Sequence, residues 1–153
     1  MSIIAEVVKV SAEELDWIGR EPAVAARRFE QGLGEKGPGR LFLDRIWREI
    51  HQLLTGEEWG TELPLAFLMV GGEQLGLDGS DLRVLDNGAT QAVAAALEAI
   101  PPEALRERYD PDELYLEGDE EEILDGVIEL YGELRTLVQE TARGSGGLLI
   151  SIF

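Results

Sequence analysis

The sequence predicts an α+β fold, in which a small sheet takes strands from both ends of the chain and several helices cover it. Residues 3–10 are rich in β-branched side chains and residues 148–153 are almost continuously apolar, so both segments are predicted to be strands. Between them, apolar residues recur mostly at helical spacing. A length of 153 residues is typical of one domain, so we expect residues 1–153 to form a single compact unit.

The first predicted helix follows directly on the first strand. Ser11 and Glu14 have the spacing of a capping box, in which the serine oxygen accepts from a first-turn amide and the glutamate reaches back. Leu15 and Ile18 are expected to face inward, and the helix is expected to stop before Pro22.

A second helix is predicted over residues 23–31, because Pro22 suits a first helical turn. Val24 and Phe29 are expected to anchor it. Residues 32–39 are rich in glycine and are predicted to form a loop. We reject a phosphate-binding loop, because no Gly-Lys-Ser/Thr ends the segment and no clear strand precedes it.

Residues 43–56 are predicted to form a short amphipathic helix around which the chain is organised. Asp44 is expected to cap its first turn, and Gly56 is expected to end it in a left-handed conformation. The apolar positions expected in the core are Leu43, Ile46, Trp47, Ile50, Leu53 and Leu54. The polar positions expected on the opposite side are Arg45, Arg48, Glu49 and Gln52.

His51 is the only histidine of the chain and lies four residues after Trp47, at the edge of the apolar stripe. Such a residue could be a base, a ligand or a hydrogen-bonded core residue. With no second histidine and no cysteine to join it, the sequence favours a structural role.

An apolar run at residues 65–70 fits either a buried strand or a short buried helix. Pro64 at its start, with Gly71 and Gly72 at its end, favours the helix.

Residues 77–81 have turn composition, and residues 82–85 are predicted to form a short strand. Asp86 or Asn87 is expected to cap the next helix, which Pro101 ends. The inward side of that helix is predicted to carry Val93, Ala96, Leu97 and Ile100.

Residues 103–109 are predicted to add a short helix, and residues 110–113 have the composition of a further helix start. A calcium-binding loop is rejected, because Leu114 and Tyr115 occupy positions that need an oxygen ligand and a glycine. The acids of residues 117–122 are better explained as charges at a helix N-terminus.

The last helix is predicted to run from about residue 119 to 143, with Gly126 and Gly132 on its polar side. Its buried stripe is predicted to be Ile123, Leu124, Val127, Ile128, Leu130, Tyr131, Leu134, Leu137 and Val138.

The chain is strongly acidic, with a formal net charge of -18. Residues 1–60 carry 8 Lys/Arg and 11 Asp/Glu (net -3), whereas residues 61–153 carry 5 and 20 (net -15). This charge disfavours nucleic acid and anionic membranes as partners; it would suit a basic partner, or serve solubility alone. No run is apolar enough to span a membrane, and the start lacks a signal peptide, so we expect a cytoplasmic protein.

Several of these segments together resemble the YfbM-like family, domain of unknown function 1877. The resemblance rests on Leu43-Asp44-Arg45-x-Trp47-x-x-x-His51-x-Leu53-Leu54-Thr55-Gly56, then Pro64-Leu65, Gly71-Gly72, Ala96-Leu97-Glu98-Ala99-Ile100 and Arg108-Tyr109-Asp110. It implies a single α+β domain of bacterial type and brings no established activity. The chain departs from the family pattern at Arg45, where lysine is more frequent, and between residues 108 and 119, which are shortened.

Three functions are compatible with these residues. The first is a non-enzymatic protein-interaction module for a basic partner, suggested by the acidic second half, the scarcity of catalytic residue types and the candidate surface residue Trp59. The second is a small-ligand pocket. The ligand-binding residues predicted for it are Trp47, His51, Trp59, Gly71 and Gly72.

The third function is an enzyme, for example a hydrolase, and it would have to use His51 as its base. Asp44 is two helical turns away and is a poor partner to orient that histidine. No catalytic residue, metal site or cofactor is predicted, and cysteine is absent, which excludes disulfides and thiolate chemistry.

Overall fold

The computed structural model describes residues 3–35, 37–76, 81–110 and 118–153. Most of the predicted turn at 77–81 and of the predicted helix start at 110–113 lies outside these described residues.

The described residues form several short strands, with most of the helices between the first strand and the last. The strands are β1 (Ala5–Val10), β2 (Arg40–Asp44), β3 (Glu73–Gln74), β4 (Asp81–Leu85) and β5 (Gly147–Ile152). The helices are α1 (Ala12–Arg20), α2 (Pro22–Gln31), α3 (Trp47–Thr55), α4 (Phe67–Val70), α5 (Asn87–Glu98), α6 (Ala104–Arg108) and α7 (Glu120–Arg143).

The strands join into one antiparallel sheet with the order β2-β1-β5-β4-β3. The strands predicted at the two ends of the chain, β1 and β5, pair with each other, with Ala5 opposite Ile152 and Val10 opposite Gly147. β5 also pairs with β4, so the last strand in the sequence lies in the middle of the sheet. The predicted α+β fold is confirmed.

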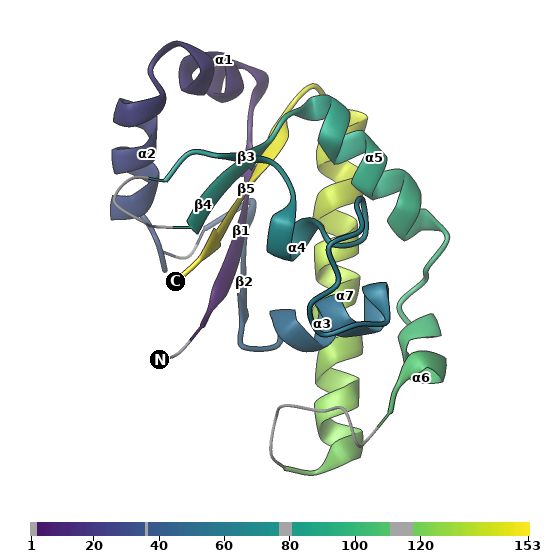
Figure 1. Ribbon diagram of the computed structural model, residues 1–153. Coiled ribbons are helices and arrows are strands. Elements are labelled where there is room, and N and C mark those ends of the chain that lie inside the picture. The colour runs from purple at the N-terminus through teal and green to yellow at the C-terminus, as the bar shows by residue number, and fades with distance from the viewer. Residues whose placement is uncertain (1–2, 36, 77–80, 111–117) are drawn as a thin grey trace.

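Helices cover both faces of the sheet (Figure 1). On one face, α1 and α2 pack their buried residues Ile18, Ala25 and Ala26 against the strands. On the other face lies the larger core, which α3, α5 and α7 share with the inward side chains of β1 and β5. α7 belongs to this layer and runs behind α3 over most of the height of the molecule (Figure 1).

Several helix ends lie where local sequence signals predict them. The capping box at the start of α1 is present, because Ser11 Oγ accepts from the Glu14 amide at 3.0 Å and Glu14 Oε1 accepts from the Ser11 amide at 3.1 Å. Gly56 ends α3 with a φ of 82°, in the left-handed region. Asp119 caps α7 by accepting from the amides of Glu121 and Glu122.

The predicted start of the central helix is wrong. Asp44 does not cap it but ends strand β2 with a φ of 52°, and α3 begins only at Trp47. Pairing with β1 satisfies the backbone of β2 and buries Leu43, and neither gain is visible in a helical periodicity count.

The predicted exposure of two residues in α3 and the predicted burial of one residue in α2 are also wrong. Glu49 and Gln52, expected on the solvent side of α3, are only 2% and 8% exposed, because α6 and the residues that follow it pack beside this helix. Val24, expected to anchor α2, is 55% exposed, because α2 turns its two buried alanines toward the sheet. Phe29 is partly buried and its ring lies 6.0 Å from that of Trp17.

Four arginines bind the backbone carbonyls at the C-terminal ends of four helices. Such carbonyls lack helical partners and carry the negative end of the helix dipole, so a cation satisfies both. Arg40 donates to the carbonyl of Gly32, just after α2, and Arg108 donates to the carbonyls of Leu53 and Leu54 in α3. Arg83 donates to the carbonyls of Phe67 and Leu68 in α4 and to that of Gly71, just after α4. Arg135 donates to the carbonyls of Leu97 and Glu98 in α5.

Candidate functional site

Trp47 and His51, two of the predicted ligand-binding residues, lie side by side on α3. Their ring centroids are 6.4 Å apart, and the indole N–H of Trp47 donates to the Ile3 carbonyl at 3.2 Å. His51 is only 1% exposed, and neither ring nitrogen has a hydrogen-bond partner among the described residues. Burial lowers the pKa of His51, and the nearby backbone of Gly60 opposes part of this shift.

Trp59 stands apart from this pair. It is 66% exposed, and the guanidinium of Arg48 lies over its ring at 5.7 Å from the centroid. Arg48 is held in turn by Glu58, with an ion pair of 3.0 Å. A tryptophan so exposed is available for contact with a partner.

Gly71 and Gly72 have backbone reasons to be glycine. A Cβ on Gly71 would come within 2.7 Å of the Phe67 carbonyl oxygen. Gly72 has a φ of 86°, and a Cβ there would come within 2.5 Å of the Val84 carbonyl oxygen. These glycines let the chain turn from α4 into β3 while lying against β4.

The structure therefore brings Trp47 and His51 into ring contact, whereas Trp59 and the two glycines have other neighbours. The ligand-binding role of the five residues stays a prediction. A base in the position of His51 would have to reach substrate from a site with almost no exposed surface.

A groove of about 440 Å³ runs between β2 and α7. One wall is formed by Gly39, Arg40 and Leu41, at the start of the edge strand of the sheet. The other wall is formed by α7 through Glu129, Gly132, Glu133, Thr136, Leu137 and Glu140.

Three carboxylates line the helical wall. Glu129, Glu133 and Glu140 are separated by four and seven residues, which places them on the same side of α7. All three are exposed, and none has an ion pair or hydrogen bond to another described residue. They span eleven residues, or about 16 Å of helix at 1.5 Å per residue.

The one cation of the groove is already neutralised. Arg40 binds the buried carboxylate of Glu6 at 2.9 Å and the Gly32 carbonyl at 2.6 Å. The groove therefore presents a net negative surface beside the edge strand.

One of the two walls of this groove was predictable from the sequence. The spacing of the three glutamates on a predicted helix could have marked them as one acidic stripe. The opposite wall could not be found, because residues 40–42 of β2 were assigned to no element and residues 43–44 to a helix.

The described residues show neither a metal site nor a membrane span. No group of three or more His, Asp or Glu side chains among them is placed to hold a metal ion. Within the same residues, no helix is both long and apolar enough to cross a membrane.

Comparisons with known proteins place the chain in a family. A family model described as a domain of unknown function (DUF1877) matches residues 1–151. The crystal structure of YfbM, a protein of unknown function from Escherichia coli, superposes with a TM-score of 0.71 at 18% identity, over 98% of this chain and 99% of that one. At this identity the likeness shows the fold alone. No curated protein matches the chain.

Proposed function

We propose that this chain, which belongs to the DUF1877 family, is a protein-interaction module whose partner presents a basic segment. The family brings no assigned activity, so the proposal rests on the chain's own surface. The observation that carries it is the row of three unpaired carboxylates, Glu129, Glu133 and Glu140, along the groove between β2 and α7.

Charge and shape support the same kind of partner. Unpaired carboxylates on one side of a groove attract Lys and Arg, and the net charge of -18 strengthens the attraction at a distance. An extended segment advances about 3.3 Å per residue and places alternate side chains on one side. Six or seven residues with a cation at every second position would match the 16 Å row of carboxylates.

The proposal is tested with a labelled nine-residue peptide that has lysine at every second position and serine between. Fluorescence anisotropy at low ionic strength should show binding that weakens steeply as NaCl is added. The same peptide with acetyllysine should not bind, because it has lost the charges.

Two variants with the same net charge separate the groove from the overall charge. The groove variant is Glu129→Gln, Glu133→Gln and Glu140→Gln, and the control carries Glu13→Gln, Glu62→Gln and Glu98→Gln at exposed positions elsewhere. We expect the groove variant to lose affinity about tenfold, or ~1.4 kcal/mol, and the control to stay within about twofold. An equal loss in both variants would mean that the acids serve only the overall charge.

The same variants identify a natural partner. Captures from a lysate should retain a basic protein at low salt and lose it at high salt with the wild-type chain and with the control variant, whereas the groove variant should not retain it at either salt. A protein retained equally by all three is not bound through the groove.

A further inference from the structure

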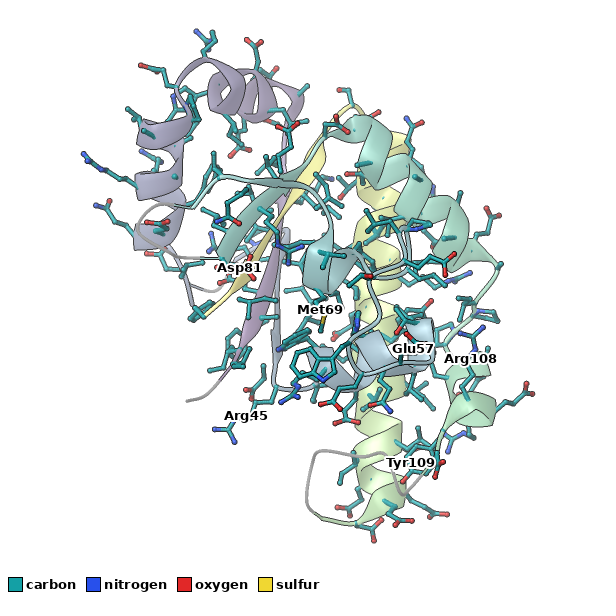
Figure 2. The ribbon with its side chains drawn as sticks, viewed as in Figure 1. Arg45, Glu57, Met69, Asp81, Arg108 and Tyr109 are labelled. Carbon is teal, nitrogen blue, oxygen red and sulfur yellow. The ribbon has the colours of Figure 1, made fainter. Side chains whose placement is uncertain are left out.

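The sheet ends at β2, whose outer side pairs with no other strand among the described residues. An edge strand presents backbone N–H and C=O groups that can pair with another extended chain. β2 has five residues, or about 16 Å at 3.3 Å per residue, and is a longer edge than β3, which has two. Figure 2 shows where β2 ends: the side chain of Arg45, directly after Asp44, points away from the sheet. β2 is thus the edge with room for an added strand.

The alternation of the antiparallel ladder shows which backbone groups of β2 are directed outward. The Lys9 amide of β1 donates to the Gly39 carbonyl at 2.7 Å. Every second residue of an antiparallel strand directs its N–H and C=O toward the same neighbour, so Leu41, two residues after Gly39, also faces β1. Phe42 therefore turns its N–H and C=O away from β1, toward the open side of the sheet.

The centre of β2 lacks the usual protection of an edge strand. Natural edge strands are often protected by charged side chains or prolines. β2 contains no proline, its charged residues Arg40 and Asp44 lie at the two ends, and its centre is Leu41-Phe42-Leu43. The Phe42 side chain is 49% exposed. An apolar, unprotected edge of this kind is typical of a surface that accepts a strand from a partner.

The two sides of this edge differ in their chemistry. Leu41 packs against the larger core and lies beside the groove with its three carboxylates on α7. Phe42, the next residue, points to the opposite face, which carries a hollow of about 470 Å³. The rings of Phe42 and Phe153 line this hollow, together with the paired Glu6 and Arg40. The β2 edge therefore offers carboxylates on one face and exposed aromatic rings on the other.

We propose that the basic segment of the partner binds as an added strand on β2 and carries cationic and apolar residues in alternation. This inference rests on the proposed function and specifies its partner. Successive side chains of a strand point to opposite faces, so the cations lie over the groove and the apolar side chains lie over Phe42 and the hollow. The backbone of the segment pairs with the outward N–H and C=O of Phe42.

The first test replaces the serines of the lysine–serine peptide by valine. Both peptides have the same length and charge, so anisotropy titrations at one ionic strength compare their apolar contacts. We expect the valine peptide to bind about tenfold more tightly, because its β-branched side chains lie opposite Phe42. Equal affinities would refute the added strand and leave the proposed basic partner standing. No binding by either peptide would refute both.

A pair of variants locates the apolar contact. Phe42→Ser removes the ring from the edge, and Val24→Ser removes a side chain of similar exposure from α2, outside the hollow. Phe42→Ser should weaken binding of the valine peptide about fivefold and change binding of the serine peptide by less than about twofold. Val24→Ser should change neither. Unchanged binding of the valine peptide to Phe42→Ser, or an equal loss in both variants, would overturn the proposal.

N-methylated peptides test the backbone pairing without any change in the protein, and they decide the question if Phe42→Ser does not fold. One valine peptide carries N-methyl groups on two lysines, and the other carries them on two valines. Only every second N–H of an added strand faces β2, so we expect one of the two peptides to lose at least about tenfold in affinity and the other to bind within about threefold of the parent. Equal effects of the two methylation patterns would overturn the pairing with β2.

A second copy of the chain is a less suitable occupant of this edge. Pairing β2 with the β2 of another copy would bring together two rows of unpaired carboxylates in molecules that each carry a net charge of -18. Size-exclusion chromatography with light scattering is expected to show a monomer, with and without the valine peptide. A dimer that the peptide does not dissociate would assign the edge to a second copy and would overturn the proposal.

Discussion

At the scale of single residues, His51 combines near-complete burial with two ring nitrogens that lack hydrogen-bond partners among the described residues. Such a group is tolerated as a neutral ring and is costly as a cation. This environment makes His51 a source of pH-dependent stability.

We expect the histidine to destabilise the fold in mild acid. Because burial lowers its pKa in the folded state, the unfolded chain takes up the proton first as the pH falls. The stability due to neutral His51 is complete above the unfolded pKa of 6.5 and is lost as the pH drops toward the folded value. Each unit between the two values corresponds to about 1.4 kcal/mol.

Urea unfolding of the wild type and His51→Phe between pH 7.5 and 5 measures this effect. The variant keeps a planar ring without a titrating group, and it should gain stability relative to the wild type as the pH falls. The carboxylates titrate in both proteins and cancel in the difference. Parallel pH curves would show that His51 does not titrate differently on folding.

Gly72 gives a second prediction at this scale. Gly72→Ala should destabilise the protein by about 1–3 kcal/mol, because φ is 86° and the new Cβ would meet the Val84 carbonyl. The matched control is Gly126→Ala in α7, where a Cβ would meet no atom within 4 Å. The control should stabilise the helix by up to ~1 kcal/mol. Urea unfolding checks both signs, and a neutral Gly72→Ala would mean that the turn can relax.

At the scale of the elements, the ends of the helices show how this acidic chain uses its few cations. Arg40, Arg83, Arg108 and Arg135 each bind one or more carbonyls at the end of a helix other than their own, from 8 to 55 residues away in the sequence. The guanidinium suits this task because its fork of donors can reach several acceptors at once: two or three carbonyls for Arg83, Arg108 and Arg135, and a carbonyl and the Glu6 carboxylate for Arg40. Each arginine thereby ties a helix to a neighbouring element.

Arg83 is the most buried of the four and the best test. It donates to the carbonyls of Phe67, Leu68 and Gly71 and pairs with Asp81 at 2.9 Å. Arg83→Met should cost about 3–5 kcal/mol, because three carbonyls and a carboxylate lose their partner. Arg83→Lys should recover only part of this loss, because an ammonium cannot bridge the same acceptors.

Arg20→Met is the control for Arg83→Met. Arg20 pairs with Asp16 at 3.5 Å on the exposed surface of α1, and such pairs contribute about 0–1 kcal/mol. Denaturant unfolding of the three variants gives the comparison. A similar cost for Arg83→Met and Arg20→Met would mean that the contacts at the end of α4 add little stability.

At the scale of the whole molecule, the formal net charge of -18 opposes folding through repulsion between acids. Salt screens this repulsion, so the melting temperature should rise as NaCl is added from 10 to 300 mM. A gain of about 1 kcal/mol would correspond to roughly 2–4 °C for a chain of this size.

The groove variant, with three fewer carboxylates, should show a smaller rise with salt. Differential scanning calorimetry of both proteins measures the two slopes. A melting temperature that falls with NaCl would show that the ion pairs of the fold outweigh its repulsion.

Several elements were predictable because their signals are local. The capping box of α1, the stop at Gly56 and the aspartate before α7 each depend on residues within a few positions of one another. The long apolar stripe of α7 and the apolar runs of β1 and β5 are strong for the same reason.

The tertiary structure alone decided the rest. β2 is a strand because β1 lies beside it, and Glu49 is buried because α6 crosses its helix, so neither result is contained in a local pattern. The candidate sites belong to this second group. A groove needs two walls, and here the second wall comes from residues up to 101 (140 − 39) positions away along the chain. Short-range periodicity and capping signals in the sequence determined the helices and the central strands. Long-range packing determined which charged side chains are buried and which face one another, because the burial of a side chain depends on all its neighbours in space.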